Sequence, residues 1–178
     1  ATDLNMRTSN SSIWACGDCA EVVHLVTEAP AYVPLSPNAF RTARVAGANA
    51  ARRGRGAPEQ FRGTVGAYAL KVAGVEIALA GLSENDARAA GFDPVTADAS
   101  HSSRAARMPG RSPIEIHLIA DRKSRRLLGG HLVGKDGAAL RANVLVPLLR
   151  ERAAVEDLYD LDLIYSPPLA PSLDPLLV

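Results

Sequence analysis

The sequence predicts an α+β fold, with a mainly antiparallel sheet and helices. Two observations lead to this prediction. Apolar and polar residues alternate in pairs of segments that short turns join, which is typical of antiparallel hairpins. Segments with helical periodicity lie between and after those pairs. The length of 178 residues fits one domain, or one domain with part of another, and is sufficient for a buried core.

The segment 8–19 combines a polar turn, a short apolar run and one acidic residue. Residues 13–15 are predicted to form a buried strand, because the run is too short for an amphipathic helix. Gly17 allows a close approach of the backbone, and Asp18 follows where a strand would end. Ligands of open α/β sheets lie beyond the carboxyl ends of strands, so Asp18 could accept hydrogen bonds from cofactor hydroxyl groups. An ordinary turn after a strand is the alternative.

Cys16 and Cys19 have the spacing of a redox pair. Asp18 lies between them, however, and a negative charge disfavours the reactive thiolate. We therefore interpret the two cysteines as small apolar side chains. A structural zinc ion requires four ligands, and the four histidines show no matching spacing, so we expect no metal site.

The next part of the chain predicts a short helix, a loop and a longer helix. Residues 20–26 fit one or two helical turns. Three prolines then favour an extended loop, because residues before proline avoid the helical region. A helix is predicted from about residue 40 to 51. Gly47 within it costs about 1 kcal/mol relative to alanine, which close packing of the helix would explain. A loop and helix that bind no ligand are equally consistent with this pattern.

A basic, glycine-containing run at residues 52–56 precedes Pro58 and is interpreted as a linker. We therefore predict two structural units, residues 1–56 and residues 57–178.

The second unit alternates predicted strands with turns. The strands share apolar–polar alternation or a high content of β-branched residues; they are expected at 64–72, 74–79, 92–97, 114–119 and 126–133.

Three helices are predicted among and after these strands. Ser83 caps the first and Gly91 ends it. Residues 138–152 form the most regular helical pattern, although Pro147 should kink it. A short helix is expected at 155–161.

Several motifs resemble the FAD-dependent pyridine nucleotide-disulfide oxidoreductases. The segment 8–19 resembles the family's second flavin-binding motif, in which a Thr-Ser opening leads through an apolar strand to Ala-x-Gly-Asp. Residues 34–39 and 44–47 resemble its Pro-Leu-x-Pro-x-Ala and Arg-x-Ala-Gly segments. The resemblance implies that Asp18 holds the ribityl chain of FAD and that the chain nearby contributes to the site. The residues it implies in cofactor binding are Gly17, Asp18, Pro37, Asn38 and Ala39.

The later part of the chain resembles the family's C-terminal interface domain. The signatures include Phe-Arg-Gly-Thr at 61–64, Gly-Leu-Ser-Glu at 81–84 and Leu-Gly-Gly at 128–130. The end, with Tyr-Ser-Pro-Pro at 165–168, resembles the coenzyme A disulfide reductase branch. The resemblance therefore implies a reductase dimerisation domain, residues 57–178, preceded by the C-terminal edge of an FAD-binding α/β domain, residues 1–56.

The resemblance implies the C-terminal part of a homodimeric flavoenzyme that uses NAD(P)H and FAD to reduce a small-molecule disulfide or polysulfide. Tyr165 is the candidate catalytic residue, because the matching tyrosine of that branch reaches the partner's active site. Its phenol could donate a hydrogen bond or a proton to a leaving thiolate. A solvent-facing tyrosine at a strand end is the alternative. The chain alone, without a redox cysteine of its own, is expected to be inactive.

One departure bears on the substrate. The branch has a tyrosine before a Pro-Gly pair, where this chain has Arg107 and Met108. This difference argues against a firm assignment of coenzyme A disulfide. Arg104, Arg107 and Arg111 could instead bind an anionic substrate or lie in a solvated loop. A sister NADH oxidase or peroxidase, and a catalytically silent dimerisation module, remain alternatives.

Composition excludes several other classes. The net charge is +1 and aromatic residues make up 4%, which argues against a nucleic-acid partner. No apolar run reaches the roughly 18 residues that cross a membrane, and no signal peptide is present, so a cytoplasmic location is expected. Residues 129–136 resemble a P-loop except that Asp136 replaces its Ser or Thr, so nucleoside triphosphate binding is not expected.

Overall fold

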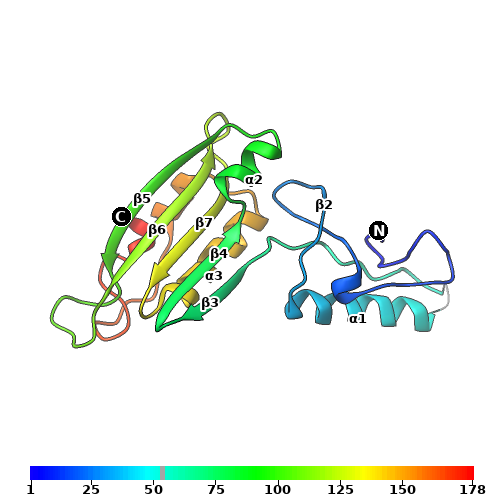
Figure 1. The fold of residues 1–178 in the computed structure, drawn as a ribbon, viewed down its shortest axis with the longest axis horizontal. Coiled ribbons are helices and arrows are strands. Elements are labelled where there is room, and N and C mark those ends of the chain that lie inside the picture. The colour runs from blue at the N-terminus through cyan, green and yellow to red at the C-terminus, as the bar shows by residue number, and fades with distance from the viewer. Residues whose placement is uncertain (53–54) are drawn as a thin grey trace. The chain divides into compact units, whose positions relative to one another are not determined.

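The computed structural model describes residues 1–52 and 55–178 (Figure 1). They divide into two compact units, Ala1–Gly66 and Ala67–Val178. Segment 57–66 belongs to the first of these units, because Phe61 joins its core. The functional boundary between residues 56 and 57 stays a prediction. In the basic run 52–56, residues 53 and 54 lie outside the described residues.

The first unit is built around one long helix, α1 (Ser36–Arg52). A two-stranded antiparallel ribbon, β1 (Val22–Val23) with β2 (Pro30–Ala31), accompanies it. A single-turn 3₁₀ helix, η1 (Gly17–Cys19), contacts α1. The core of the unit consists of buried apolar side chains, with Trp14 packed against its edge: Met6, Ala20, Val22, Val45, Ala46 and Phe61.

The predicted buried strand at 13–15 is wrong. Ile13 is 51% exposed, and Trp14 forms only an isolated bridge with Arg7. The Arg7 guanidinium lies 5.5 Å from the centre of the Trp14 ring, and its Nε donates to the Ser11 carbonyl at 2.7 Å. Local polar contacts thus turn this segment at the surface of its unit, where a strand would need a neighbour for its backbone hydrogen bonds.

The predicted helical turns at 20–26 are also wrong. Two adjacent β-branched residues there form β1, and the chain reverses so that the His24 amide donates to the Ala29 carbonyl at 3.0 Å. Helix α1 is present but begins at Ser36 rather than at residue 40. Pro37 fits its first turn, where an amide hydrogen would have no partner within the helix.

The second unit contains a five-stranded, entirely antiparallel sheet in the order β3-β4-β7-β6-β5. Ala73 and Gly74 have φ values of 48° and 80°, as a two-residue type I′ hairpin turn requires, and they join β3 to β4. The strands are β3 (Tyr68–Val72), β4 (Val75–Gly81), β5 (Pro94–Ser102), β6 (Pro113–Asp121) and β7 (Leu127–Gly134).

Helix α2 (Glu84–Ala89) follows β4 and is capped as predicted, since the Ser83 hydroxyl accepts from the Asp86 amide. Helix α3 (Ala138–Arg150) continues past Pro147 for one further turn. The short helix predicted at 155–161 is a 3₁₀ helix, η2 (Val155–Asp160). A final 3₁₀ turn, η3 (Pro175–Leu177), begins after Asp174. These elements confirm the predicted α+β fold.

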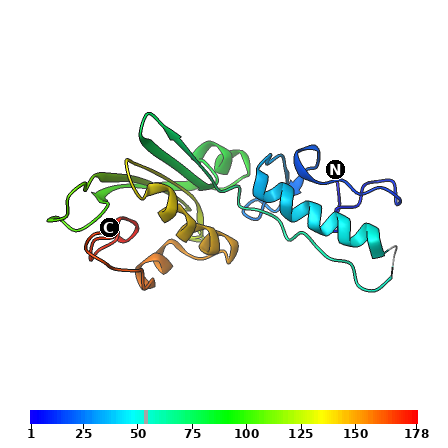
Figure 2. The ribbon, with the colours of Figure 1, turned by 90° about the horizontal axis from the view of Figure 1, so that it is seen from below.

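Helix α3 covers one face of the sheet (Figure 2). A side chain at Gly130 would place its Cβ 2.6 Å from Leu145 Cδ1, so helix and sheet meet closely there. His131, the next residue of β7, points to the other face because strand side chains alternate. We call this other side, away from α3, the open face. The largest fully buried apolar side chains of the unit are Ile114, Ile119, Leu127, Leu128, Leu132, Leu145 and Leu149.

Candidate functional site

Three of the predicted cofactor residues lie together where η1 meets the first turn of α1. The Gly17 amide donates to the Thr42 hydroxyl at 3.0 Å, and that hydroxyl donates to the Asn38 carbonyl at 2.7 Å. Gly17 has a φ of +73°, and a Cβ built on it would lie 3.6 Å from the Cβ of Ala39. A positive φ favours glycine here, and Thr42 links the turn to the helix.

Asp18 is exposed, and its carboxylate has no hydrogen bond or ion pair within residues 1–52 and 55–178. Pro37 is also exposed, whereas Asn38 is buried and its side-chain amide donates to the Val33 carbonyl at 3.3 Å. The Asp18 carboxylate is therefore available as an acceptor at the surface of its unit.

The residues fit one edge of a flavin site. The unpaired Asp18 carboxylate would accept hydrogen bonds from ribityl hydroxyl groups, and Gly17 keeps the backbone beside it free of a side chain. The amides of Asn38 and Ala39 already donate to the Leu35 carbonyl, at 2.9 and 3.0 Å. These two amides are therefore not free to donate to a flavin ring that approaches this turn.

Tyr165 lies on the C-terminal segment of the second unit and is 58% exposed. Its hydroxyl has no hydrogen-bond partner within the described ranges. A tight turn follows at once, in which the amides of Leu169 and Ala170 donate to the Ser166 carbonyl at 2.8 and 2.7 Å. The Ala105 amide donates to the Pro167 carbonyl at 3.1 Å, which connects this turn to loop 103–112.

A hollow of about 570 Å³ lies between α3, loop 103–112 and the C-terminal segment. Large apolar side chains at its rim face solvent, with Leu140, Ile164 and Leu169 exposed by 77%, 86% and 72%. Together with Tyr165 these three residues form what we call the C-terminal surface. Exposed apolar side chains gathered around one hollow are typical of a protein contact site.

The three loop arginines do not form one cluster of free cations. Arg104 is ion-paired with Asp136, and its Nη1 donates to the Pro109 carbonyl at 3.4 Å. Arg107 and Arg111 are exposed, and neither has an interaction with another described residue.

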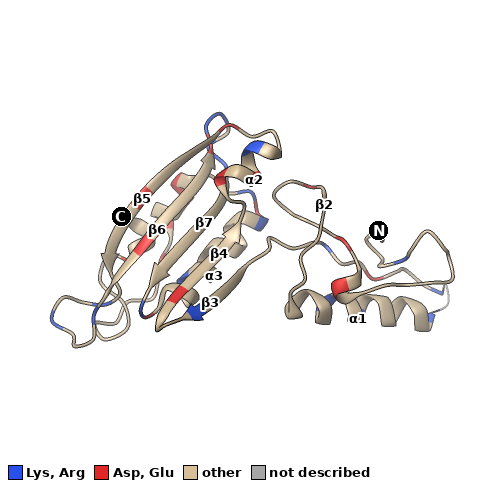
Figure 3. Cartoon of the chain, in the orientation of Figure 1, with Lys and Arg blue, Asp and Glu red and all other residues tan. Residues whose placement is uncertain are grey.

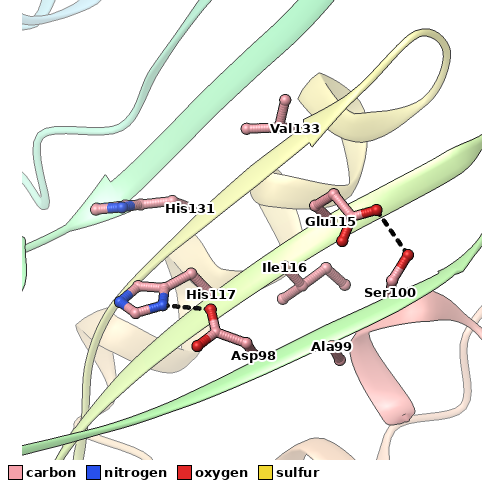
Figure 4. Close-up of a pocket in the computed structure, with 8 residues that line it drawn as sticks. All are labelled: Asp98, Ala99, Ser100, Glu115, Ile116, His117, His131 and Val133. Carbon is pink, nitrogen blue, oxygen red and sulfur yellow. Dashed lines mark hydrogen bonds and ion pairs between the residues drawn. The ribbon is translucent and has the colours of Figure 1, made fainter.

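Sequence reasoning missed a polar group on the open face of the sheet (Figure 4). His117 and His131 stand opposite each other on β6 and β7, with ring centres 5.8 Å apart. His117 Nδ1 lies 2.7 Å from an Asp98 carboxylate oxygen on β5. Burial of the ring, and next the nearby His117, lower the pKa of His131. These residues line a hollow of about 330 Å³, in which Ser100 donates to Glu115 at 2.7 Å.

The cysteines are not bonded to each other; Cys19 Sγ donates to the Cys16 carbonyl at 3.2 Å. In the described part of the chain, no three His, Cys, Asp or Glu side chains are placed to hold a metal ion. No described helix is long and apolar enough to cross a membrane. Lys and Arg occur together with Asp and Glu along the sheet and its connections (Figure 3).

Comparison with known proteins finds relatives that match almost the whole chain. The chain is 36% identical to the NAD(P)H coenzyme A polysulfide/persulfide reductase of Pyrococcus horikoshii, over 99% of this chain and 39% of that protein. A solved NAD-dependent persulfide reductase from A. fulgidus matches with a TM-score of 0.92 and 36% identity, over 99% of this chain and 32% of that chain. A water-forming NADH oxidase from Lactobacillus brevis matches with a TM-score of 0.91 and 28% identity, over 99% and 38%.

The chain thus spans 39% of the length of the Pyrococcus relative. Residues 67–176 match the dimerisation domain of the pyridine nucleotide-disulphide oxidoreductases, and this match begins where the second compact unit begins. The match covers more than half of the sequence and confirms the resemblance seen in the motifs. The chain belongs to the pyridine nucleotide-disulphide oxidoreductase family.

Proposed function

We propose that this chain is the C-terminal part of a cytoplasmic FAD-dependent NAD(P)H oxidoreductase that reduces a small-molecule disulfide, polysulfide or persulfide. In this proposal residues 67–178 pair two copies of the enzyme, and each copy presents Tyr165 to the active site of its partner. Residues 1–56 supply one edge of the flavin site. The relatives named as persulfide reductases, at 36% identity, support the substrate class.

The C-terminal surface is the observation that carries this proposal. Leu140, Ile164 and Leu169 expose most of their apolar area around a hollow in a unit that matches a dimerisation domain. Covering these side chains would remove their apolar surface from water, which stabilises an association by about 25 cal/mol per Å² of apolar area buried. Tyr165 adjoins Ile164, so a partner seated on this surface would also meet the phenol.

The two candidate sites have different tasks in this proposal. A bound flavin would accept a hydride and pass on electrons, and the protein would orient the flavin and tune its electrostatic surroundings. Asp18 would orient the cofactor through its hydroxyl groups. Tyr165, with an unpaired phenol, would donate a hydrogen bond or a proton to the sulfur that leaves when a disulfide bond is broken.

An NADH oxidase is the second candidate function. The solved NADH oxidase matches 99% of this chain at a TM-score of 0.91, so the fold does not separate the two activities. Arg107 and Met108 also replace the tyrosine expected before Pro-Gly in the disulfide reductase branch. Oxygen consumption with NAD(P)H, compared with reduction of a low-molecular-weight disulfide or persulfide, distinguishes the two candidates in the polypeptide that contains this chain.

Sedimentation of the 178-residue chain tests the pairing. We expect a dimer that Ile164→Asp dissociates, because a carboxylate would be placed in an apolar contact. Leu70→Asp is the matched control, since Leu70 is 54% exposed on β3, outside the C-terminal surface. A monomer at high concentration would count against the pairing.

Kinetics of the complete polypeptide test the role of Tyr165. Tyr165→Phe removes the hydroxyl and keeps the ring, so we expect slower disulfide turnover with an unchanged dimer. Unchanged turnover in Tyr165→Phe would remove Tyr165 from the reaction.

Asp18→Asn should weaken FAD retention, measured by flavin absorbance after gel filtration, without affecting dimerisation.

A further inference from the structure

One buried guanidinium connects the segments that surround Tyr165. Arg141 lies on α3, and its side chain is only 11% exposed. Its Nε donates to an Asp174 carboxylate oxygen at 2.8 Å, and its Nη2 donates to the Ser103 carbonyl at 2.9 Å. Longer contacts reach the carbonyls of Gly137 at 3.2 Å and Leu169 at 3.5 Å. Arg141 therefore joins its own helix to three segments that are distant from it in sequence.

These contacts hold both sides of the turn that follows Tyr165. Ser103 begins the loop whose Ala105 amide bonds to Pro167, and Leu169 lies within the turn itself. Beyond the turn, Asp174 also accepts a hydrogen bond from the Leu176 amide at 3.1 Å, which starts η3. The backbone on either side of the turn is thus attached, directly or through one loop, to α3.

The Tyr165 side chain makes no hydrogen bond of its own among the described residues, so its position depends on this backbone. The Arg141–Asp174 pair is well suited to fix it, because Asp174 is only 7% exposed. Removal of one member of such a pair leaves an uncompensated buried charge, which is strongly destabilising. The planar guanidinium can serve a carboxylate and carbonyls together, whereas a lysine ammonium cannot reproduce that fork.

We propose that Arg141, held by Asp174, is a positioning residue that keeps the 165–170 turn in place so that Tyr165 is presented in a fixed orientation. The inference rests on the function proposed for Tyr165 and extends it to a residue that never contacts the substrate. Substitution of Arg141 should therefore make the 165–170 turn less ordered, without removing a group that reacts.

Hydrogen exchange in the 178-residue chain tests the structural part. The reporters are the amides of Ala105, Leu169 and Ala170, whose hydrogen bonds lie within or against the turn. Arg141→Met should accelerate their exchange by about tenfold or more, because the free energy of local opening sets the population of the open state from which these amides exchange. Arg141→Lys should recover only part of the protection. Arg122→Met is the matched control, since Arg122 forms an exposed ion pair with Asp93 and should leave the three amides unchanged.

A double variant separates positioning from general instability. Arg141→Met with Asp174→Leu removes both charges, and apolar replacement of a buried pair often preserves the fold. The sheet amides should therefore stay protected while Leu169 and Ala170 exchange rapidly. Protection of the turn equal to that of the unmodified chain, with the sheet intact, would overturn the proposal.

Kinetics of the complete polypeptide test the functional part. Arg141→Met should lower kcat more than it raises KM, and it should have little further effect in a Tyr165→Phe background, because the two residues act through one element. Full additivity of the two substitutions would contradict the positioning role. If Tyr165→Phe alone has no effect, the function proposed for Tyr165 fails, while the exchange result still decides whether Arg141 orders the turn.

Discussion

The two compact units differ in the size and packing of their buried cores. In Ala67–Val178 the sheet and α3 enclose Leu145 and Leu149 at 0% exposure. A side chain on Gly129 would meet the Leu82 backbone, and one on Gly130 would meet the Leu145 side chain. In Ala1–Gly66 the core is small, and two large aromatic residues, Tyr32 and Phe40, are 66% and 76% exposed.

The difference indicates where each unit obtains its stability. A sheet with a covering helix forms a core of many large side chains within one unit, whereas a single helix with a two-residue ribbon forms only a small core. Exposed aromatic residues, which occur in both units, are typical of surfaces that other protein covers, so the small core is the feature that sets the first unit apart. This contrast supports the proposal that the first unit is the edge of a larger FAD-binding domain, and the following predictions test it from the largest expected effect to the smallest.

Gly129→Ala should have the largest effect. Its Cβ would lie 2.1 Å from the Leu82 carbonyl oxygen and 2.7 Å from the Leu82 amide nitrogen, and backbone atoms cannot move aside as a flexible side chain can. We expect a loss above the usual overpacking range of about 1–3 kcal/mol. Urea denaturation of the chain, followed by circular dichroism of the sheet, measures it. A variant as stable as the unmodified chain would show that the sheet packs less closely than the structure indicates.

Leu145→Ala should destabilise the second unit by about 2–5 kcal/mol, through lost burial and the cavity left behind. Val45→Ala is the corresponding change in the first unit, where Val45 is 4% exposed. It removes about two methyl groups and should cost about 1–2 kcal/mol. Hydrogen exchange resolved by residue assigns each loss to its unit. Equal losses at both sites would remove the contrast between the two cores.

The sequence predicted the second unit well because its signals are local. Alternation identified the strands, and Ala73–Gly74 and the Ser83 cap marked where elements turn or begin. In the first unit, residues 20–26 were misassigned because Val22 and Val23 of β1 pair with Ala31 and Pro30 of β2, which no periodicity indicates. Gly47 was expected to pack closely, yet a Cβ there would meet no atom within 4 Å, so that expectation is wrong for the described structure.

The candidate sites were only partly predictable. Asp18 and Tyr165 came from motif resemblance, and their roles stay predictions. The hydrogen bonds of Arg141 join Ser103, Leu169 and Asp174, which are separated by loops whose paths no local pattern determines. The His117–His131 pair requires the register of β6 against β7, which depends on the intervening turn. Alternation alone could place both histidines on strands, but not opposite each other.

Gly47→Ala tests whether further protein packs against α1 of the first unit in the complete polypeptide. Gly47 is exposed in the middle of α1, so alanine should stabilise the unit by about 1 kcal/mol through helix propensity alone. Thermal unfolding of the first unit, read from the Trp14 fluorescence, measures the change. If the complete polypeptide instead loses stability while the chain gains it, further protein packs against this position, as the proposed FAD-binding domain would require.

The smallest effect should come from pH and concern the open face alone. Burial of the ring and the nearby His117 lower the pKa of His131 below its ordinary value of 6.5, and a weaker attraction from Asp86 opposes this. Below pH 6.5 the unfolded chain then binds a proton that the folded chain binds less readily, so stability falls as the pH drops through 6.5 towards the folded pKa. Urea midpoints at pH 7.5 and 5.5 should differ less in His131→Gln than in the unmodified chain.

His101→Gln, on β5 outside this hollow, is the control and should keep the full difference. An identical pH response in His131→Gln would mean that the folded chain does not make His131 harder to protonate, as the pKa lowered by burial requires.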